Sequence, residues 1–388
     1  MIIESITIYL LFIAAMTLFG KFAAVGSTRF SHGVSVAPKA INTWFILMVT
    51  LFTVICAIRF NVGTDYPRYL SAYVTGRVAK AEKFELLFKG ISTFLHNHRI
   101  HPSIYFGVWA FIQIFFFLLA FKKEKYLYPY LMFFLFTNGL FLSWMNGIRQ
   151  DLATCIWLFS LTYITNKKII PYVICCIIAF MFHRSAIILI IFYPLFVKGT
   201  YFNKIPVQLA FIALAFILRY TFDSYIMSLN SIINFYTQVT GYNDFEIENL
   251  YNQMAVDRGG SGVVLFIRAI IYLIIIFYSK KMKLFFNSKH FNLIYMFFII
   301  GFFTKYAIPV GAITIARPFR YFSFFLTIIL AYFIYFLYNE KKLKNGKVFG
   351  FCIILLYLSI FIISQFKASI ESFTIFQFFF DQPQFPTL

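Results

Sequence analysis

The sequence predicts an all-α, polytopic membrane protein with about twelve transmembrane helices, an external N-terminus and a large external loop. Hydrophobic residues make up 61% of the chain and charged residues 12%, and the mean hydropathy is +0.80. A soluble domain carries about 25% charged residues. Apolar runs that reach the roughly 20 residues needed to cross a bilayer recur from one end of the chain to the other. The membrane is therefore the expected solvent of a single domain, 1–388.

The apolar runs define the individual spans. The expected spans are 2–20, 41–58, 103–121, 127–143, 148–165, 169–182, 185–197, 205–222, 262–279, 291–308, 317–338 and 348–365. The spans 169–182 and 185–197 are short, and His183 and Arg184 interrupt the apolar run between them. They could instead form a broken pair or a re-entrant hairpin, so the expected total is about ten to twelve.

The first span is expected to be retained. It carries Glu4 and lacks both a basic leading region and a small-residue cleavage site, so it does not have the pattern of a signal peptide.

The distribution of basic residues predicts the orientation. Alternate connections hold more than half of the lysines and arginines but only Glu124 and Glu340 among the acidic residues. These connections are 21–39, 122–125, 167–168, 198–204, 280–289 and 340–347. Basic connections face the cytoplasm, so both termini are expected outside. The net charge of +20 is then mainly a topology signal, and no alternating basic and aromatic stripe indicates nucleic-acid binding.

Two external segments are too long to be simple turns. Residues 59–102 contain the polar motif RFNVGTDYPRY and then apolar residues at helical spacing, which predict a helix at the outer interface. Residues 223–261 carry carboxylates among tyrosines and asparagines and end in a DRGGSG turn. A loop of that length is typical of a lid or an acceptor-binding surface.

Ionisable residues gather at the predicted outer ends of the spans. They are Arg59, Asp65, Arg68, Arg149, Asp151, His183, Arg184, Arg317 and Arg320. Such residues are expensive to keep at a membrane and indicate function. Arginine makes paired hydrogen bonds to phosphate while keeping its charge, so the group predicts a phosphate or diphosphate ligand. Arginines at helix ends can also simply extend to the interface.

Three of these positions share a short motif. In IARPFRYF, Arg317, Arg320 and Tyr321 are spaced to lie on one helical face. Pro318 suits a first helical turn, which would point backbone N–H groups at an anion.

Two residues are candidates for a general base. Asp65 lies among tyrosines, an arrangement suited to holding a sugar and taking its hydroxyl proton, but it could equally cap a helix. His183 lies between apolar runs beside Arg184 and Ser185, where it could serve a site or only the structure. The cluster HNHRIH could resemble a metal site, but no cysteine or carboxylate completes it, so no metal is expected.

Four motifs carry a family resemblance. RFNVGTDYPRY, NGIRQDLA, FHRSA and RPFRYF occur in this order, each at a predicted outer boundary. Between about residues 55 and 325 the chain resembles the EpsG family of Wzy-like bacterial polysaccharide polymerases. The resemblance implies a multi-pass glycosyltransferase of the bacterial cytoplasmic membrane. It would polymerise polyprenyl-diphosphate-linked oligosaccharides into exopolysaccharide, capsule or O-antigen at the outer face, without a cofactor or metal.

The resemblance also implies roles for residues. Arg149, Arg317 and Arg320 would clamp the diphosphate with help from Arg59, and Asp65 or His183 would be the base. The remaining candidates for substrate binding are Asn61, Tyr66, Tyr69, Asn146, Gln150 and Tyr321. Membrane lipid, a chain-length regulator and the flippase of the same pathway are the implied partners.

Three alternatives remain open at this point. A flippase or transporter of lipid-linked sugars would also need an arginine-lined cavity, but here the charges lie at one face and no inverted repeat is visible. A membrane acyltransferase that modifies exported glycans would use His183 as its base. A glycan ligase would use the same donor and differ only in its acceptor.

Overall fold

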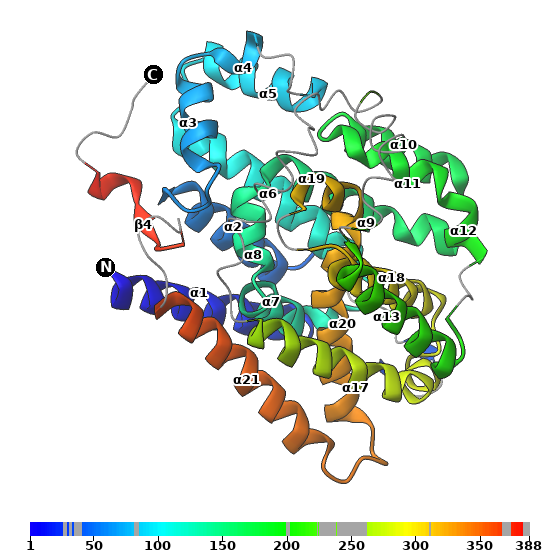
Figure 1. The fold of residues 1–388 in the computed structure, drawn as a ribbon. Coiled ribbons are helices and arrows are strands. Elements are labelled where there is room, and N and C mark those ends of the chain that lie inside the picture. The colour runs from blue at the N-terminus through cyan, green and yellow to red at the C-terminus, as the bar shows by residue number, and fades with distance from the viewer. Residues whose placement is uncertain are drawn as a thin grey trace. The chain divides into compact units, whose positions relative to one another are not determined.

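The computed structural model describes most of the chain (Figure 1). The described residues are 1–25, 29–30, 33–34, 41–80, 85–198, 202–222, 224, 238, 262–309, 312–366 and 374–382. All but two positions of the predicted external loop 223–261 therefore lie outside the described residues.

Helices dominate the structure. In chain order they are α1 (Ile2–Ala23), α2 (Thr43–Ala57), α3 (Tyr66–Val74), α4 (Arg77–Lys80), α5 (Leu86–Asn97), α6 (Pro102–Ala120), α7 (Tyr128–Thr137), α8 (Leu140–Asn146), α9 (Ile148–Thr165), α10 (Ile169–Phe180), α11 (Ile188–Ile191), α12 (Tyr193–Lys198), α13 (Ile205–Tyr220), α17 (Val263–Phe286), α18 (Lys289–Ala307), α19 (Ile313–Ala316), α20 (Arg320–Asn339) and α21 (Gly346–Phe366). The short remaining elements are the 3-10 turns η1 (Lys125–Leu127), η2 (Arg184–Ile187), η5 (Arg317–Phe319) and η7 (Phe379–Asp381) and the strands β1 (Arg29–Phe30), β2 (Gly33–Val34), β3 (Arg59–Phe60) and β4 (Gln377–Phe378).

The all-α membrane fold is confirmed, since the structure is about 82% helical. Among the described residues, five helices are long and apolar enough to cross a membrane, and a sixth span is possible if one bent pair is counted. The five are α1, α6, α17, Arg317–Asn339 and α21. The total of about twelve spans and the external N-terminus stay predictions.

One expected span differs in shape from the prediction. The segment 127–143 was expected to be continuous, but Lys125–Thr137 and Leu140–Asn146 form a pair bent by 64°. Gly139, with a φ of 83°, lies at the bend. Glycine adopts this left-handed conformation without steric cost, and it commonly ends a helix there.

The chain folds into two compact units. Unit 1 contains Met1–Tyr163, Ile169–His183 and Leu330–Leu388, and unit 2 contains Ile164–Lys168 and Arg184–Ile329.

In unit 1, α1 packs against α2, α7 and α21, and α2 packs against α6. Figure 1 shows α21 running beside α1, although the two helices come from opposite ends of the chain. Aromatic side chains join α1 and α2 to α8: Phe12 and Phe52 both meet Phe141 edge-on, with ring centroids 5.8 Å apart in each pair. Buried aromatic rings give close packing where lipid removes the usual hydrophobic drive between helices.

Unit 2 is built on α13, α17 and α18. Gln208 of α13 accepts a hydrogen bond of 2.7 Å from the Tyr295 hydroxyl of α18, and both side chains are buried. Phe211 and Phe303 stack with ring centroids 4.2 Å apart. Polar and aromatic contacts thus hold α13 to α18 along their length.

The predicted external segment 59–102 has a helical structure in its described part. Strand β3 pairs with β4 in antiparallel fashion, with Arg59 opposite Phe378, and α3, α4 and α5 follow. Within α5, Phe88 is buried and Leu86 is exposed. The position of this segment outside the membrane stays a prediction.

Candidate functional site

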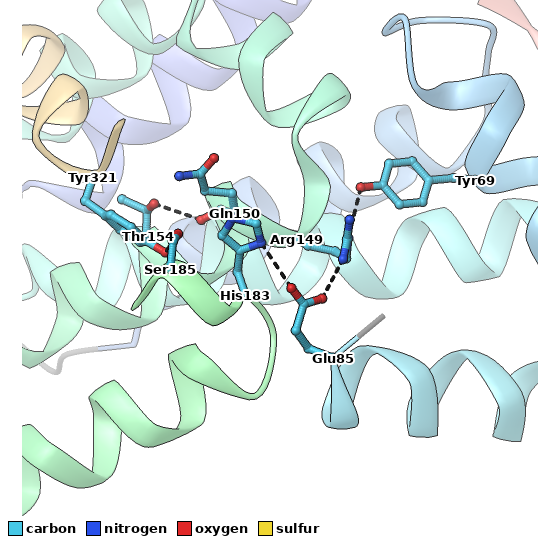
Figure 2. A network of polar contacts seen from close by, with 8 residues as sticks. All are labelled: Tyr69, Glu85, Arg149, Gln150, Thr154, His183, Ser185 and Tyr321. Carbon is cyan, nitrogen blue, oxygen red and sulfur yellow. Dashed lines mark hydrogen bonds and ion pairs between the residues drawn. The ribbon is translucent and has the colours of Figure 1, made fainter. Parts of the chain in front are cut away.

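A buried carboxylate organises the polar side chains of unit 1 (Figure 2). Arg149 Nη1 donates to Glu85 Oε2 over 2.5 Å, and His183 Nδ1 lies 3.3 Å from Glu85 Oε1. The side chain of Glu85 is only 2% exposed, against 17% for Arg149 and 7% for His183. One carboxylate therefore holds both a strong cation and an imidazole in a site largely screened from water.

Three segments bring these residues together. Glu85 immediately precedes α5, and the neighbouring Leu87 N–H donates to the carbonyl of Met181, just after α10, over 3.0 Å. That bond ties the start of α5 to the turn that carries His183. Arg149 lies in the first turn of α9, so residues distant in sequence converge on one point.

Arg149 is also held by aromatic residues. Its Nε donates to the Tyr69 hydroxyl over 3.4 Å, and its guanidinium carbon lies 5.8 Å from the centre of the Phe88 ring. A planar guanidinium can bind a carboxylate and an aromatic face at once, which a lysine at this position could not reproduce.

The neighbouring positive charges affect the pKa of Glu85 more than its burial does. Burial alone would raise the pKa of Glu85, but the hydrogen bond with His183 and the positive charge of Arg149 lower it to about 2. The carboxylate is thus ionised throughout the physiological range. A charged carboxylate on Nδ1 fixes the orientation of an imidazole and favours the tautomer whose other nitrogen, Nε2, accepts a proton.

A tight turn precedes α3. Arg59 is 1% exposed, donates from Nη1 to the Cys56 carbonyl over 2.9 Å, and lies 5.0 Å from the Phe106 ring centre. The Tyr66 hydroxyl donates to the Arg59 carbonyl over 3.1 Å. Arg59 and Tyr66, both predicted site residues, are therefore in contact, and both are buried.

The same turn is anchored on α8. Asn146 Oδ1 accepts hydrogen bonds from the Thr64 hydroxyl over 2.6 Å and from the Asp65 backbone N–H over 2.8 Å. A Cβ added at Gly63, whose φ is +101°, would lie 2.7 Å from the Met145 carbonyl oxygen. Asn146 is thus brought to the predicted GTDY motif, where it shapes the turn.

The carboxylate of Asp65 is more exposed to solvent than that of Glu85. Helix α3 begins at the next residue, yet the Asp65 side chain makes no capping hydrogen bond. Its carboxylate is 42% exposed and lies 3.9 Å from Arg68 Nη1. The side chain of Asp65 therefore does not cap α3.

Two further predicted residues of unit 1 lie nearby in sequence. Asn61 adopts a left-handed conformation with a φ of 54°, as turn asparagines often do. Gln150 is buried in α9, and its carbonyl accepts a hydrogen bond of 2.8 Å from the Thr154 hydroxyl (Figure 2). Their roles in binding substrate stay predictions.

The predicted residues of the RPFRYF motif belong to unit 2. Arg317 begins η5, Pro318 is buried there, and Arg320 begins α20, so the expected helical start is present. Tyr321 is fully buried, and its hydroxyl lies 2.8 Å from the Ser185 hydroxyl of η2 (Figure 2). This contact joins η2 to the start of α20 within unit 2.

Sequence reasoning missed Glu85. It is an acidic residue at the start of an apolar helical stretch, in a segment already predicted to be external. The rule that ionisable residues beside membrane spans indicate function could have included it. No arginine or histidine is near Glu85 in sequence, so the local pattern does not mark it as part of a site.

No group of three or more potential metal ligands occurs within the described ranges. The His96 and His98 side chains of HNHRIH instead meet neighbours of their own segment: the His96 ring lies 6.0 Å from that of Tyr73, and His98 Nδ1 lies 2.8 Å from the Phe94 carbonyl.

Helices of membrane-spanning length and a buried network of arginine, glutamate and histidine define the class: this is a multi-pass helical membrane protein with a polar site in unit 1. The chain matches the EpsG family over residues 42–380, most of its length, and it belongs to that family. Comparison with curated proteins and with solved structures gives no match. The expected family is therefore confirmed, and membership fits a polysaccharide polymerase.

Proposed function

We propose that this protein is a membrane glycosyltransferase that polymerises polyprenyl-diphosphate-linked oligosaccharides at the outer face of the bacterial cytoplasmic membrane. Family membership and the membrane-type helices support the class of reaction. The observation that carries the chemistry is the contact of His183 with the ionised carboxylate of Glu85. This arrangement suits a general base that must act on a sugar hydroxyl.

In the proposed reaction, an acceptor hydroxyl attacks the anomeric carbon of the donor chain. The new bond joins the acceptor oxygen to that carbon, and the bond between the carbon and the diphosphate oxygen breaks. The electron pair leaves with the diphosphate, and the hydroxyl proton passes to Nε2 of His183. Glu85 stabilises the imidazolium that forms, as a carboxylate does beside a catalytic histidine.

The structure favours His183 over Asp65 as this base. His183 is oriented by a carboxylate and screened from water, whereas the Asp65 carboxylate is partly exposed beside Arg68. The binding residues predicted from sequence keep their proposed roles: Arg149, Arg317 and Arg320 as phosphoryl ligands, and Tyr69 and Asn146 as parts of the substrate-binding surface. Diphosphate leaves readily once cations neutralise its charge, so the proposal requires neither nucleotide nor metal.

Reconstitution of the purified protein in lipid with a synthetic polyprenyl-diphosphate oligosaccharide tests the proposal. A ladder of products spaced by one repeat, with release of polyprenyl diphosphate, is expected. Substrate that crosses the bilayer without extension would contradict it and indicate a flippase. Transfer onto an unrelated acceptor without a ladder would indicate a ligase.

Arg149→Ala provides the matching variant. It should abolish the ladder, because the buried carboxylate loses its strongest partner and the donor loses a phosphoryl ligand. Arg77→Ala, which removes an exposed arginine of α4, should leave the ladder intact. Polymer of full length from Arg149→Ala would exclude a role for this guanidinium.

A further inference from the structure

Four basic side chains gather at one end of unit 2. Lys305 of α18 lies close enough to Arg219 of α13, Arg268 of α17 and Arg320 of α20 to interact with their charges. Tyr306 is also within range of the charges of Arg268 and Arg219. Only Arg320 was singled out from the sequence, so three members of this cluster have no assigned role.

The four basic side chains converge because of the directions in which their helices run. Arg219 and Lys305 lie in the last turns of α13 and α18, whereas Arg268 lies near the start of α17 and Arg320 begins α20. Hydrogen bonds fasten these ends together. Arg219 Nη1 donates to the Ile308 carbonyl over 3.2 Å, and the Tyr306 hydroxyl donates to the Leu265 carbonyl over 2.7 Å.

The charges of Arg219, Arg268 and Lys305 are poorly compensated within the described part of unit 2. That part contains no aspartate or glutamate; the carboxylates from Asp223 to Asp257 lie outside it. Arg219, Arg268 and Lys305 form no ion pair among the described residues. The Nε atom of Arg268 is buried and has no hydrogen-bond partner there.

Helix dipoles offset only part of this charge. The negative ends of α13 and α18 favour Arg219 and Lys305, but the start of α20 is a positive end, where the charge of Arg320 is unfavourable. Like charges repel one another, and because Lys305 is exposed and the three arginines are half-buried, water screens part of this repulsion. An anion with several oxygens would relieve that repulsion and could occupy the fork of Arg268.

We infer that Arg219, Arg268, Lys305 and Arg320 form a binding site in unit 2 for a phosphoryl anion. Arginine supplies the paired donors that phosphate oxygens accept, and lysine adds a compact charge. The phosphoryl group could belong to a lipid headgroup or to a diphosphate. Identification of the occupant as the diphosphate of a lipid-linked sugar rests on the proposed function, whereas binding itself does not.

Binding of inorganic pyrophosphate to the full chain tests this inference. The protein is placed in nanodiscs of phosphatidylcholine, and the dissociation constant is measured from the pyrophosphate-dependent rise in its thermal transition, since a ligand of the folded state stabilises it. Arg268→Gln and Lys305→Gln should each weaken binding about tenfold, equivalent to about 1.4 kcal/mol. Arg268→Lys should recover part of the loss, because it restores charge but not the paired donors.

Lys280→Gln is the matched control, since it removes an exposed cation at the opposite end of α17. It should leave the dissociation constant unchanged. The inference is overturned if pyrophosphate does not bind saturably, as expected if a carboxylate from the segment 223–257 already neutralises the cluster. Equal affinity in the parent, Arg268→Gln and Lys305→Gln would overturn it too.

A second arm identifies the source of the phosphoryl group. Nanodiscs containing phosphatidylglycerol are compared with nanodiscs given the same negative charge by oleic acid, which has no phosphate. Weaker pyrophosphate binding in the first set alone supports the site and assigns it to a lipid headgroup. Equal binding in the two sets supports the site and excludes the headgroup of an anionic lipid as its occupant. Because binding is measured without turnover, absence of a polymer ladder would refute the proposed function and leave this inference standing.

Discussion

At the scale of single residues, Glu85 links two basic groups that sequence alone leaves unconnected. Its carboxylate contacts Arg149 and His183 and is almost completely enclosed. A buried ion pair is weak evidence of stability by itself, because desolvation opposes the attraction. Loss of the carboxylate, however, would leave a guanidinium and an imidazole without their shared partner.

Glu85→Gln should therefore change the pH dependence of stability. The folded pKa of Glu85 is about 2, below its ordinary value of 4.5, so the ionised form favours folding. Its contribution, on the order of 3 kcal/mol, is fully present above about pH 4.5 and is lost as the pH falls toward about 2. Thermal transitions of the two proteins in nanodiscs should differ most at neutral pH and converge in acid. A difference that does not shrink below about pH 4 would contradict the assigned ionisation.

Single substitutions also distinguish His183 from Asp65 as the proposed base. His183→Gln should lower the rate of polyprenyl diphosphate release in a single turnover by about 10²- to 10⁴-fold, the usual contribution of a general base. Asp65→Asn should cost less than about tenfold, because its carboxylate is open to solvent.

The pH–rate profile separates a base from a structural residue. The acidic limb of the profile should disappear in His183→Gln and persist in Asp65→Asn. His98→Gln, a change at an exposed histidine, serves as control and should retain both rate and profile. Loss of the acidic limb in Asp65→Asn alone would reverse the assignment.

At the scale of elements, the turn before α3 depends on a close approach to α8. Gly63 combines a φ of +101° with a position where a Cβ would meet the Met145 carbonyl oxygen at 2.7 Å. Asn146, the last residue of α8, then bonds Thr64 and Asp65. The glycine of the GTDY motif is thus required by backbone contact, which explains why the motif contains it.

Gly63→Ala should destabilise the fold by about 2 kcal/mol, because alanine is strained in the left-handed region and its methyl group clashes with backbone. Gly90→Ala in α5 is the matched control, since nothing lies within 4 Å of its added Cβ. Alanine is favoured over glycine inside a helix by up to about 1 kcal/mol, so this control should be neutral or stabilising. Thermal transitions in nanodiscs measure both changes, and equal effects would show that the turn is not tightly packed.

At the scale of the whole molecule, hydrophobic periodicity and composition were enough to predict the long apolar helices. Long apolar runs became α1, α6, α17 and α21 because each can satisfy its backbone hydrogen bonds internally. The bend at Gly139 escaped prediction, since a single glycine in an apolar run does not reveal its φ. The sequence placed Arg149 and His183 among the ionisable residues at predicted span ends, and both contact Glu85, while their roles in the reaction stay predictions.

The rest of the site depends on contacts between distant segments. Glu85 meets Arg149 across 64 positions, and Lys305 lies within range of the charges of Arg219, Arg268 and Arg320, so four different helices contribute to this cluster. Helix packing decides such neighbours, and the local pattern of a span carries no information about them. The burial of Arg59 was hidden for the same reason: the sequence shows an arginine at a span end but not the Phe106 ring beside it.

The orientation of the molecule gives a final prediction, on which the outer-face reaction depends. The connection between α20 and α21 carries Lys341, Lys342 and Lys344, so it should face the cytoplasm. The end of α5, with exposed His98, should face outward.

In a background where the exposed Cys352 is replaced by serine, a membrane-impermeant maleimide should label His98→Cys in intact spheroplasts. Lys342→Cys should react only after the membrane is opened, and lysed cells in which both react provide the control for accessibility. The reverse pattern would place His183 and Glu85 on the cytoplasmic side of the bilayer, where exported lipid-linked sugars could not reach them, and the proposed reaction would have to be abandoned.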